Sequence, residues 1–172
     1  SFVLAPPLCR IPFLLCSAGV LSIISAISCA ISGLCLFALS PQLLSGGYAL
    51  WVVSIIMENI IMVNVALFFA MILSSAATAS FAVFGFYVLA RMMSQILGIL
   101  DSTKEVTNFQ GLELTMQLVS ILMPRLDLMG QTSWLLYGVP SGIGYGFVIA
   151  QGLAYSALIL LAALIDLVLR KF

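Results

Sequence analysis

The sequence feature that most constrains the fold is an uninterrupted apolar run over residues 48–73, which contains one charged residue, Glu58. About 20 apolar residues suffice to cross the ~30 Å hydrocarbon core of a bilayer as an α-helix, so this run predicts a transmembrane helix. Glu58 lies ten residues into the run, which places it about 15 Å deep, close to the midplane. A charge there costs on the order of 2.5–3.5 kcal/mol unless it is neutral, paired or facing protein or water. Two interpretations remain open: Glu58 holds helices together, or it takes part in transport or coupling.

The composition places the whole chain in a membrane. Of its 172 residues 63% are hydrophobic and 7% are charged, and the mean hydropathy is +1.27. A soluble domain normally carries charges on about a quarter of its residues. A transmembrane β-barrel would show alternating segments of about ten residues, whereas the apolar runs here are unbroken and far longer. The sequence therefore predicts an all-α membrane protein.

Charge and composition also exclude several kinds of site. The six basic and six acidic residues cancel, so the net charge suggests no nucleic-acid partner. The chain has no histidine, which removes histidine metal sites and catalytic sets such as Ser-His-Asp. The four cysteines form no C-x-x-C pair, and we interpret them as small hydrophobes: Cys9, Cys16, Cys29 and Cys35. We expect no catalytic residue, metal or cofactor in this chain.

Four apolar runs predict a single domain, residues 1–172, with about four transmembrane helices. The crossings are expected at about 11–39, 48–73, 81–100 and 147–169. Residues 74–80 contain neither a charge nor a proline, so they fit a turn or a continuous helix. Because the apolar length from residue 48 to residue 100 is about twice one crossing, we expect a turn.

The third run carries its own charge, Arg91. In a hairpin that turns near Ala77, Glu58 and Arg91 would differ in depth by about 7.5 Å at 1.5 Å per residue. A long arginine side chain can cover much of that distance, and buried ions in membranes tend to pair. We hypothesise a buried Glu58–Arg91 pair; the alternative is that Arg91 reaches to the nearer membrane surface.

The one extended polar region lies at residues 101–129. Within it, residues 112–123 predict an amphipathic helix that is too short to span and that lies at the interface or packs against the bundle. Glu113 in this helix and Arg125 and Asp127 after it are expected to form an interfacial loop.

Residues 130–146 are rich in glycine and proline. They lack the lysine and the spacing of a phosphate-binding loop. We interpret them as a loop or a broken helix that enters the bilayer. Trp134 and Tyr137 in this segment are typical of the membrane interface.

The distribution of cations suggests the orientation. Four crossings place both termini on one side, and three of the six cations flank those ends: Arg10, Arg170 and Lys171. Because cytoplasmic segments carry an excess of Lys and Arg, we expect cytoplasmic termini. The sequence shows no convincing internal repeat, which disfavours a transporter built from inverted halves.

Three segments resemble the C-terminal half of an ABC-2-type ABC transporter permease. The sequence Pro-Leu-Cys-Arg at residues 7–10 resembles a cytoplasmic turn of these permeases. The amphipathic segment that ends in Pro-Arg-Leu-Asp at residues 124–127 resembles the region before their last helix. Residues 155–172, which end in Arg-Lys-Phe, resemble their closing helix and its basic, aromatic end.

The resemblance implies a six-helix permease subunit in a bacterial inner membrane, of which this chain is a fragment that lacks two N-terminal helices. It also implies a second permease subunit and a separate cytoplasmic ATPase, with Pro7 and Arg10 in contact with that ATPase. The substrate path would run between permease subunits. The chain has no Walker motif, so ATP hydrolysis would belong to the partner.

Two other classes of function remain. The chain can be a structural or assembly subunit of a larger membrane complex, with the polar region at residues 101–129 making the contacts. It can also be an intramembrane enzyme, but the sequence offers no recognisable nucleophile–base set.

Overall fold

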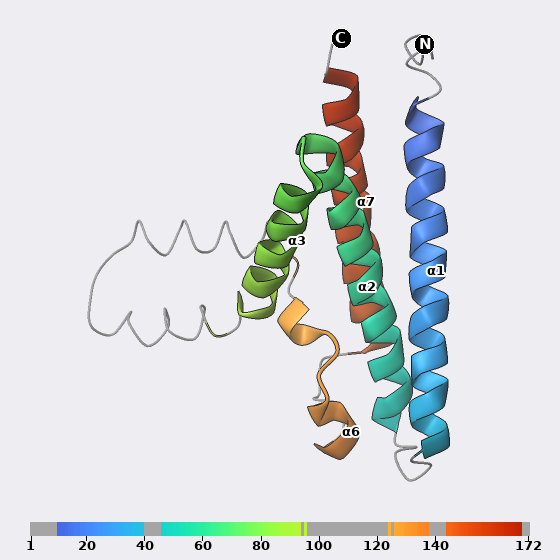
Figure 1. Cartoon of the computed structure of the whole chain (residues 1–172). Coiled ribbons are helices and arrows are strands. Elements are labelled where there is room, and N and C mark those ends of the chain that lie inside the picture. The colour runs from blue at the N-terminus through green and yellow to red at the C-terminus, as the bar shows by residue number, and fades with distance from the viewer. Residues whose placement is uncertain are drawn as a thin grey trace, which may run out of the picture.

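The structure is a computed structural model, and it describes residues 10–39, 46–93, 95, 124, 126–137 and 144–169. The elements in chain order are α1 (Arg10–Leu39), α2 (Gly46–Ile72), α3 (Ala76–Arg91), the short 3-10 helix η3 (Leu126–Leu128), α6 (Ser133–Tyr137) and α7 (Tyr145–Leu169). Within these described ranges every element is a helix (Figure 1). The predicted all-α fold class is confirmed.

Three described helices are long and apolar enough to cross a membrane. They are α1, α2 and α7, with apolar spans of 29, 26 and 25 residues. The protein is therefore an integral membrane protein. In contrast, α3 has 16 residues, or a length of about 24 Å, which is shorter than the ~30 Å hydrocarbon core. A fourth crossing at residues 81–100 is thus not confirmed, and residues 96–100 lie outside the described part of the chain.

Helix α2 is the centre of the bundle. It packs against α1, α3, α6 and α7, and its most extensive contacts are with α7. Figure 1 shows α1 running antiparallel to α2, whereas α7 runs parallel to it. As a result, the start of α1 and the end of α7 lie at the same end of the bundle.

The connection between α2 and α3 is shorter than the predicted turn at residues 74–80. Only residues 73–75 lie outside the two helices, and Ser75 has an extended backbone before α3 begins at Ala76. The predicted turn is wrong for residues 76–80, because three of these five residues are alanine, the strongest helix former. The Ala79 N–H and the Thr78 hydroxyl both donate to the Ser75 carbonyl and secure this first turn.

Three described elements lie along one side of α2 (Figure 1): α3, η3 and α6. Figure 1 shows α3 descending from the α2–α3 turn, while η3 and α6 lie further along the same side. The segment at residues 130–146, predicted as a loop or broken helix, thus contains α6. Helix α7 begins near the end of this segment, at Tyr145. The amphipathic helix expected at residues 112–123 lies outside the described residues.

Two hydrophobic clusters join these three elements to α2 and α7. The cluster beside α3 contains the buried side chains Ile61, Val65, Ala90, Leu126 and Met129. The second cluster joins Leu50, Trp134 and Val148. Since Trp134 is 1% exposed, its indole faces protein and anchors α6 to the bundle.

A charged clamp at the end of α3

Glu58 and Arg91 meet because the hairpin turns earlier than the sequence suggests. With the turn centred on Ser74, Glu58 lies sixteen residues before it and Arg91 seventeen residues after it. Their depths then differ by about 1.5 Å rather than 7.5 Å at 1.5 Å per residue. Arg91 Nη1 lies 3.2 Å from both Oε1 and Oε2 of Glu58. The hypothesised pair is therefore present in the structure.

Arg91 also binds the backbone of η3 and of Met129, the residue that follows it. Its Nη1 atom donates to the carbonyl oxygens of Leu126 at 3.0 Å and of Met129 at 2.9 Å. A short helix leaves most of its carbonyls without intrahelical partners, and these need donors where water is scarce. We call this set the Arg91 clamp: the Arg91 guanidinium, the Glu58 carboxylate and the carbonyl groups of Leu126 and Met129. It joins α2, α3 and η3 at one point.

The two charges of the clamp are unequally covered. The Glu58 side chain is 12% exposed and the Arg91 side chain 36% exposed. The Tyr87 side chain interacts with the same carboxylate. Arg91 also lies in the last turn of α3, where a cation is favoured by the helix dipole. Charge, hydrogen bonds and helix polarity therefore all favour this arrangement.

Gly130 brings the backbone close to the clamp. Its φ of +61° lies in the left-handed region, which glycine adopts without a steric penalty. A Cβ atom at this position would lie 2.7 Å from Glu58 Oε2. The Gly130 N–H donates to Ser54 Oγ at 3.0 Å, and this hydroxyl donates to the Trp51 carbonyl at 2.7 Å. Gly130 thus fixes the segment after η3 to α2.

A second polar contact lies further along α2. Asn64 Nδ2 donates to Ser156 Oγ at 2.6 Å and to the Ile60 carbonyl at 2.9 Å. Both Asn64 and Ser156 are buried, and their bond links α2 to α7. Four residues before Ser156, Gly152 of α7 lies close to Met57 of α2. A Cβ atom added to Gly152 would be 2.8 Å from Met57 Sδ. A small residue and a polar bond are the two usual means of joining transmembrane helices.

Of the other predicted site residues, two lie in described helices. Asp127 is buried in η3, and its carbonyl accepts a hydrogen bond from Gln131 Nε2 at 2.7 Å. Arg10 is the first residue of α1. The other three lie outside the described residues: Pro7, Glu113 and Arg125.

The contacts at this site connect α2, α3 and η3. Among the described residues, no group of three or more His, Cys, Asp and Glu side chains is placed to hold a metal ion. The opposite charges of Glu58 and Arg91 balance each other, and the remaining acceptors are backbone carbonyls. The clamp can hold η3 against α2, or release it if the pair opens.

The comparisons with known proteins add no family. No family model, no curated protein and no solved structure matches the chain. The resemblance to ABC-2-type permeases therefore rests on the three segments named above.

Proposed function

We propose that this chain is the membrane-spanning part of a permease subunit in an ATP-driven export system of the ABC-2 type. In this proposal a separate cytoplasmic ATPase drives it, and a second permease subunit completes the substrate path. The assembly lies in a bacterial inner membrane with the termini of this chain in the cytoplasm. The chain itself hydrolyses no ATP.

The observation that carries the proposal is the non-helical backbone at residues 129–132, between η3 and α6. This stretch lies beside Glu58, near the middle of α2. Non-helical backbone at membrane depth is tolerated only where it is buried in protein or lines a water-filled cavity. Helices broken near the midplane are a recurring feature of transporters, which favours transport over a purely passive role.

The position of the clamp also fits mechanical coupling. One of the three segments that carry the permease resemblance, residues 124–127, includes Leu126, whose carbonyl Arg91 binds. The proposed ATPase contact at Pro7 and Arg10 includes the first residue of α1, and α1 packs along α2. A push on α1 would therefore reach Glu58 and the clamp through α2.

The test is the composition and activity of the native assembly. The full-length protein is tagged, extracted in mild detergent and analysed by native mass spectrometry, and its ATPase activity is measured. We expect a nucleotide-binding subunit in the assembly, with a hydrolysis rate that Arg91→Met lowers and Gly85→Ala leaves unchanged. An assembly without a nucleotide-binding protein would refute the proposal.

The second candidate is a structural or assembly subunit of a larger membrane complex. The clamp favours this candidate, because the negative charge of Glu58 is balanced by Arg91 of the same chain. Crosslinks from residues 101–129 to a partner that is not an ATPase, with no transport defect in Glu58→Gln, would select this candidate.

A further inference from the structure

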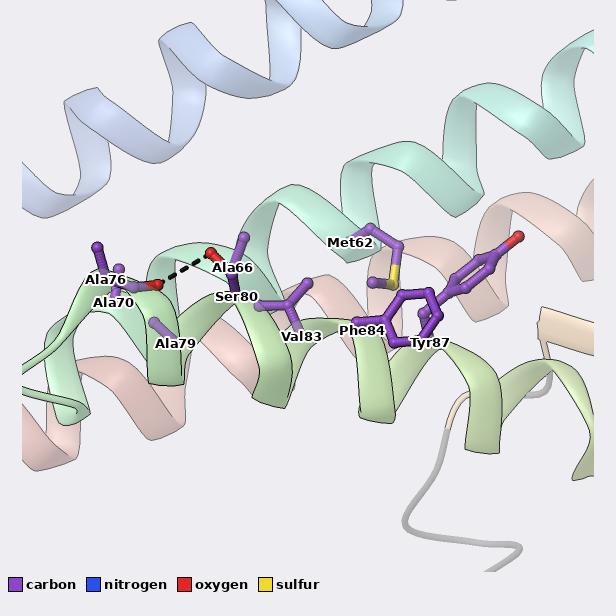
Figure 2. A pocket seen from close by; sticks show the side chains of 9 residues that line it. All are labelled: Met62, Ala66, Ala70, Ala76, Ala79, Ser80, Val83, Phe84 and Tyr87. Atoms are coloured by element: carbon purple, nitrogen blue, oxygen red, sulfur yellow. Dashed lines mark hydrogen bonds between the residues drawn. The ribbon is translucent and has the colours of Figure 1, made fainter.

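We propose that a groove between α2 and α3 holds one acyl chain of a membrane lipid. The groove has a volume of about 550 Å³. Figure 2 shows Ala70 and Ala76 at one end and Tyr87 at the other. The remaining lining residues lie between them: Met62, Ala66, Ala79, Ser80, Val83 and Phe84.

The walls of the groove are suited to hydrocarbon. Small side chains from both helices line much of the groove, and Phe84, which also lines it, is 65% exposed. The hydroxyl of Ser80 donates to the Ala76 carbonyl at 2.9 Å, so its proton is already used (Figure 2). A polar ligand would find little to bind along these walls, and the fitting ligand is apolar.

The length of the groove matches one leaflet. From Ala76 to Tyr87 the helix rises about 16 Å, which is about half of the ~30 Å hydrocarbon core. One end lies beside the α2–α3 turn, where α2 emerges from its apolar span, and the other lies beside the carboxylate of Glu58. A chain entering from the leaflet on the side of that turn would end near the clamp.

The width of the groove decides between a lipid chain and a helix of another protein. Spread over ~16 Å, the volume gives a cross-section of about 34 Å². An α-helix with its side chains is about 10 Å across and needs roughly 80 Å². A single file of methylenes fits inside the groove, whereas a helix could only pack over its mouth and would leave the groove unfilled. Retention then comes from van der Waals contact with the close walls, because the surrounding lipid is equally apolar.

The inference does not rest on an export role, and lipid photolabelling tests it. The full-length protein is reconstituted in vesicles that contain phosphatidylcholine with a diazirine in the middle of one acyl chain. After irradiation, labelled residues are mapped by mass spectrometry. The exposed face of α1, which includes Ile23 and Ile27, serves as the internal reference for passing lipid. We expect residues 76–87 to be labelled at least about tenfold more strongly, equal to about 1.4 kcal/mol of preference.

Two groove-filling variants and one control make the test specific. Ala70→Phe and Ser80→Phe change exposed positions on different helices, and each places a ring in the groove. Both should reduce the labelling to the level of α1. Ala77→Phe makes the same kind of change at an exposed position that does not line the groove, and it should leave the labelling unchanged. The proposal would be overturned if the groove were labelled no more strongly than α1, which is also the result expected if a second chain covers the groove. It would equally be overturned if Ala70→Phe and Ser80→Phe left the labelling of the groove unchanged.

Discussion

The replacement of Gly130 by alanine should loosen the whole clamp. The added Cβ atom would lie 2.7 Å from Glu58 Oε2 and 3.6 Å from Arg91 Nη1. A carboxylate at the end of a side chain could normally move away, but here Arg91 holds both of its oxygens at 3.2 Å. Movement of Glu58 therefore weakens the ion pair.

The magnitude follows from two costs. A residue with a Cβ atom in the left-handed conformation costs about 1–2 kcal/mol. Overpacking adds typically about 1–3 kcal/mol. Gly130→Ala should thus lower the free energy of unfolding by about 2–5 kcal/mol. In a Glu58→Ala background the clash is absent, and the same substitution should cost only the backbone part, about 1–2 kcal/mol.

The assay is reversible unfolding in mixed micelles with increasing sodium dodecyl sulfate, followed by tryptophan fluorescence. Trp134 is a suitable reporter because it is fully buried beside α2. Gly85→Ala is the matched control: its Cβ meets nothing within 4 Å, and alanine favours a helix interior by up to about 1 kcal/mol. If the free energy of unfolding of Gly130→Ala stays within about 0.5 kcal/mol of the parent value, Gly130 is not held in a left-handed turn against Glu58.

Three further predictions use the same assay. Arg91→Met should cost about 3–5 kcal/mol because it leaves a covered carboxylate without its partner, and Arg91→Lys should recover part of this because it keeps the positive charge; equal losses in the two variants would show that the charge of Arg91 does not stabilise Glu58. Asn64→Leu should cost about 0.6–1.7 kcal/mol through loss of the hydrogen bond to Ser156, and Ser156→Ala should then add nothing in that background. Gly152→Ala should cost about 1–3 kcal/mol by pressing on Met57, and Met57→Ala should relieve only part of that cost, because the Cβ atom at residue 57 remains 3.0 Å from the added Cβ; a cost unchanged by Met57→Ala would contradict the close packing of α2 and α7.

The long helices were accessible from the sequence because length and unbroken apolarity determine them directly. The runs at 11–39, 48–73 and 147–169 differ from α1, α2 and α7 by two residues or fewer at each end. The pairing of Glu58 with Arg91 was accessible as a hypothesis, because each is the one charge in its apolar run.

The position of the α2–α3 turn and the carbonyl acceptors of the clamp could not be predicted from the sequence in the same way. Residues 74–80 carry no charge or proline to mark the turn, and only the preference of alanine for helix moves it to residues 73–75. The acceptors on Leu126 and Met129 are carbonyl groups, which every residue has, so no residue type marks them. Gly130 did offer a signal, since a glycine in a polar segment favours a left-handed turn.

The central claim is that Glu58 and Arg91 act as one unit that holds α2, α3 and η3 together. A double-mutant cycle tests it most directly: Glu58→Ala, Arg91→Ala and the double variant are unfolded under the same conditions. We predict a coupling free energy of about 1–3 kcal/mol, so that the second substitution costs far less once the first is made. Additive losses within about 0.5 kcal/mol would show that the two side chains act independently.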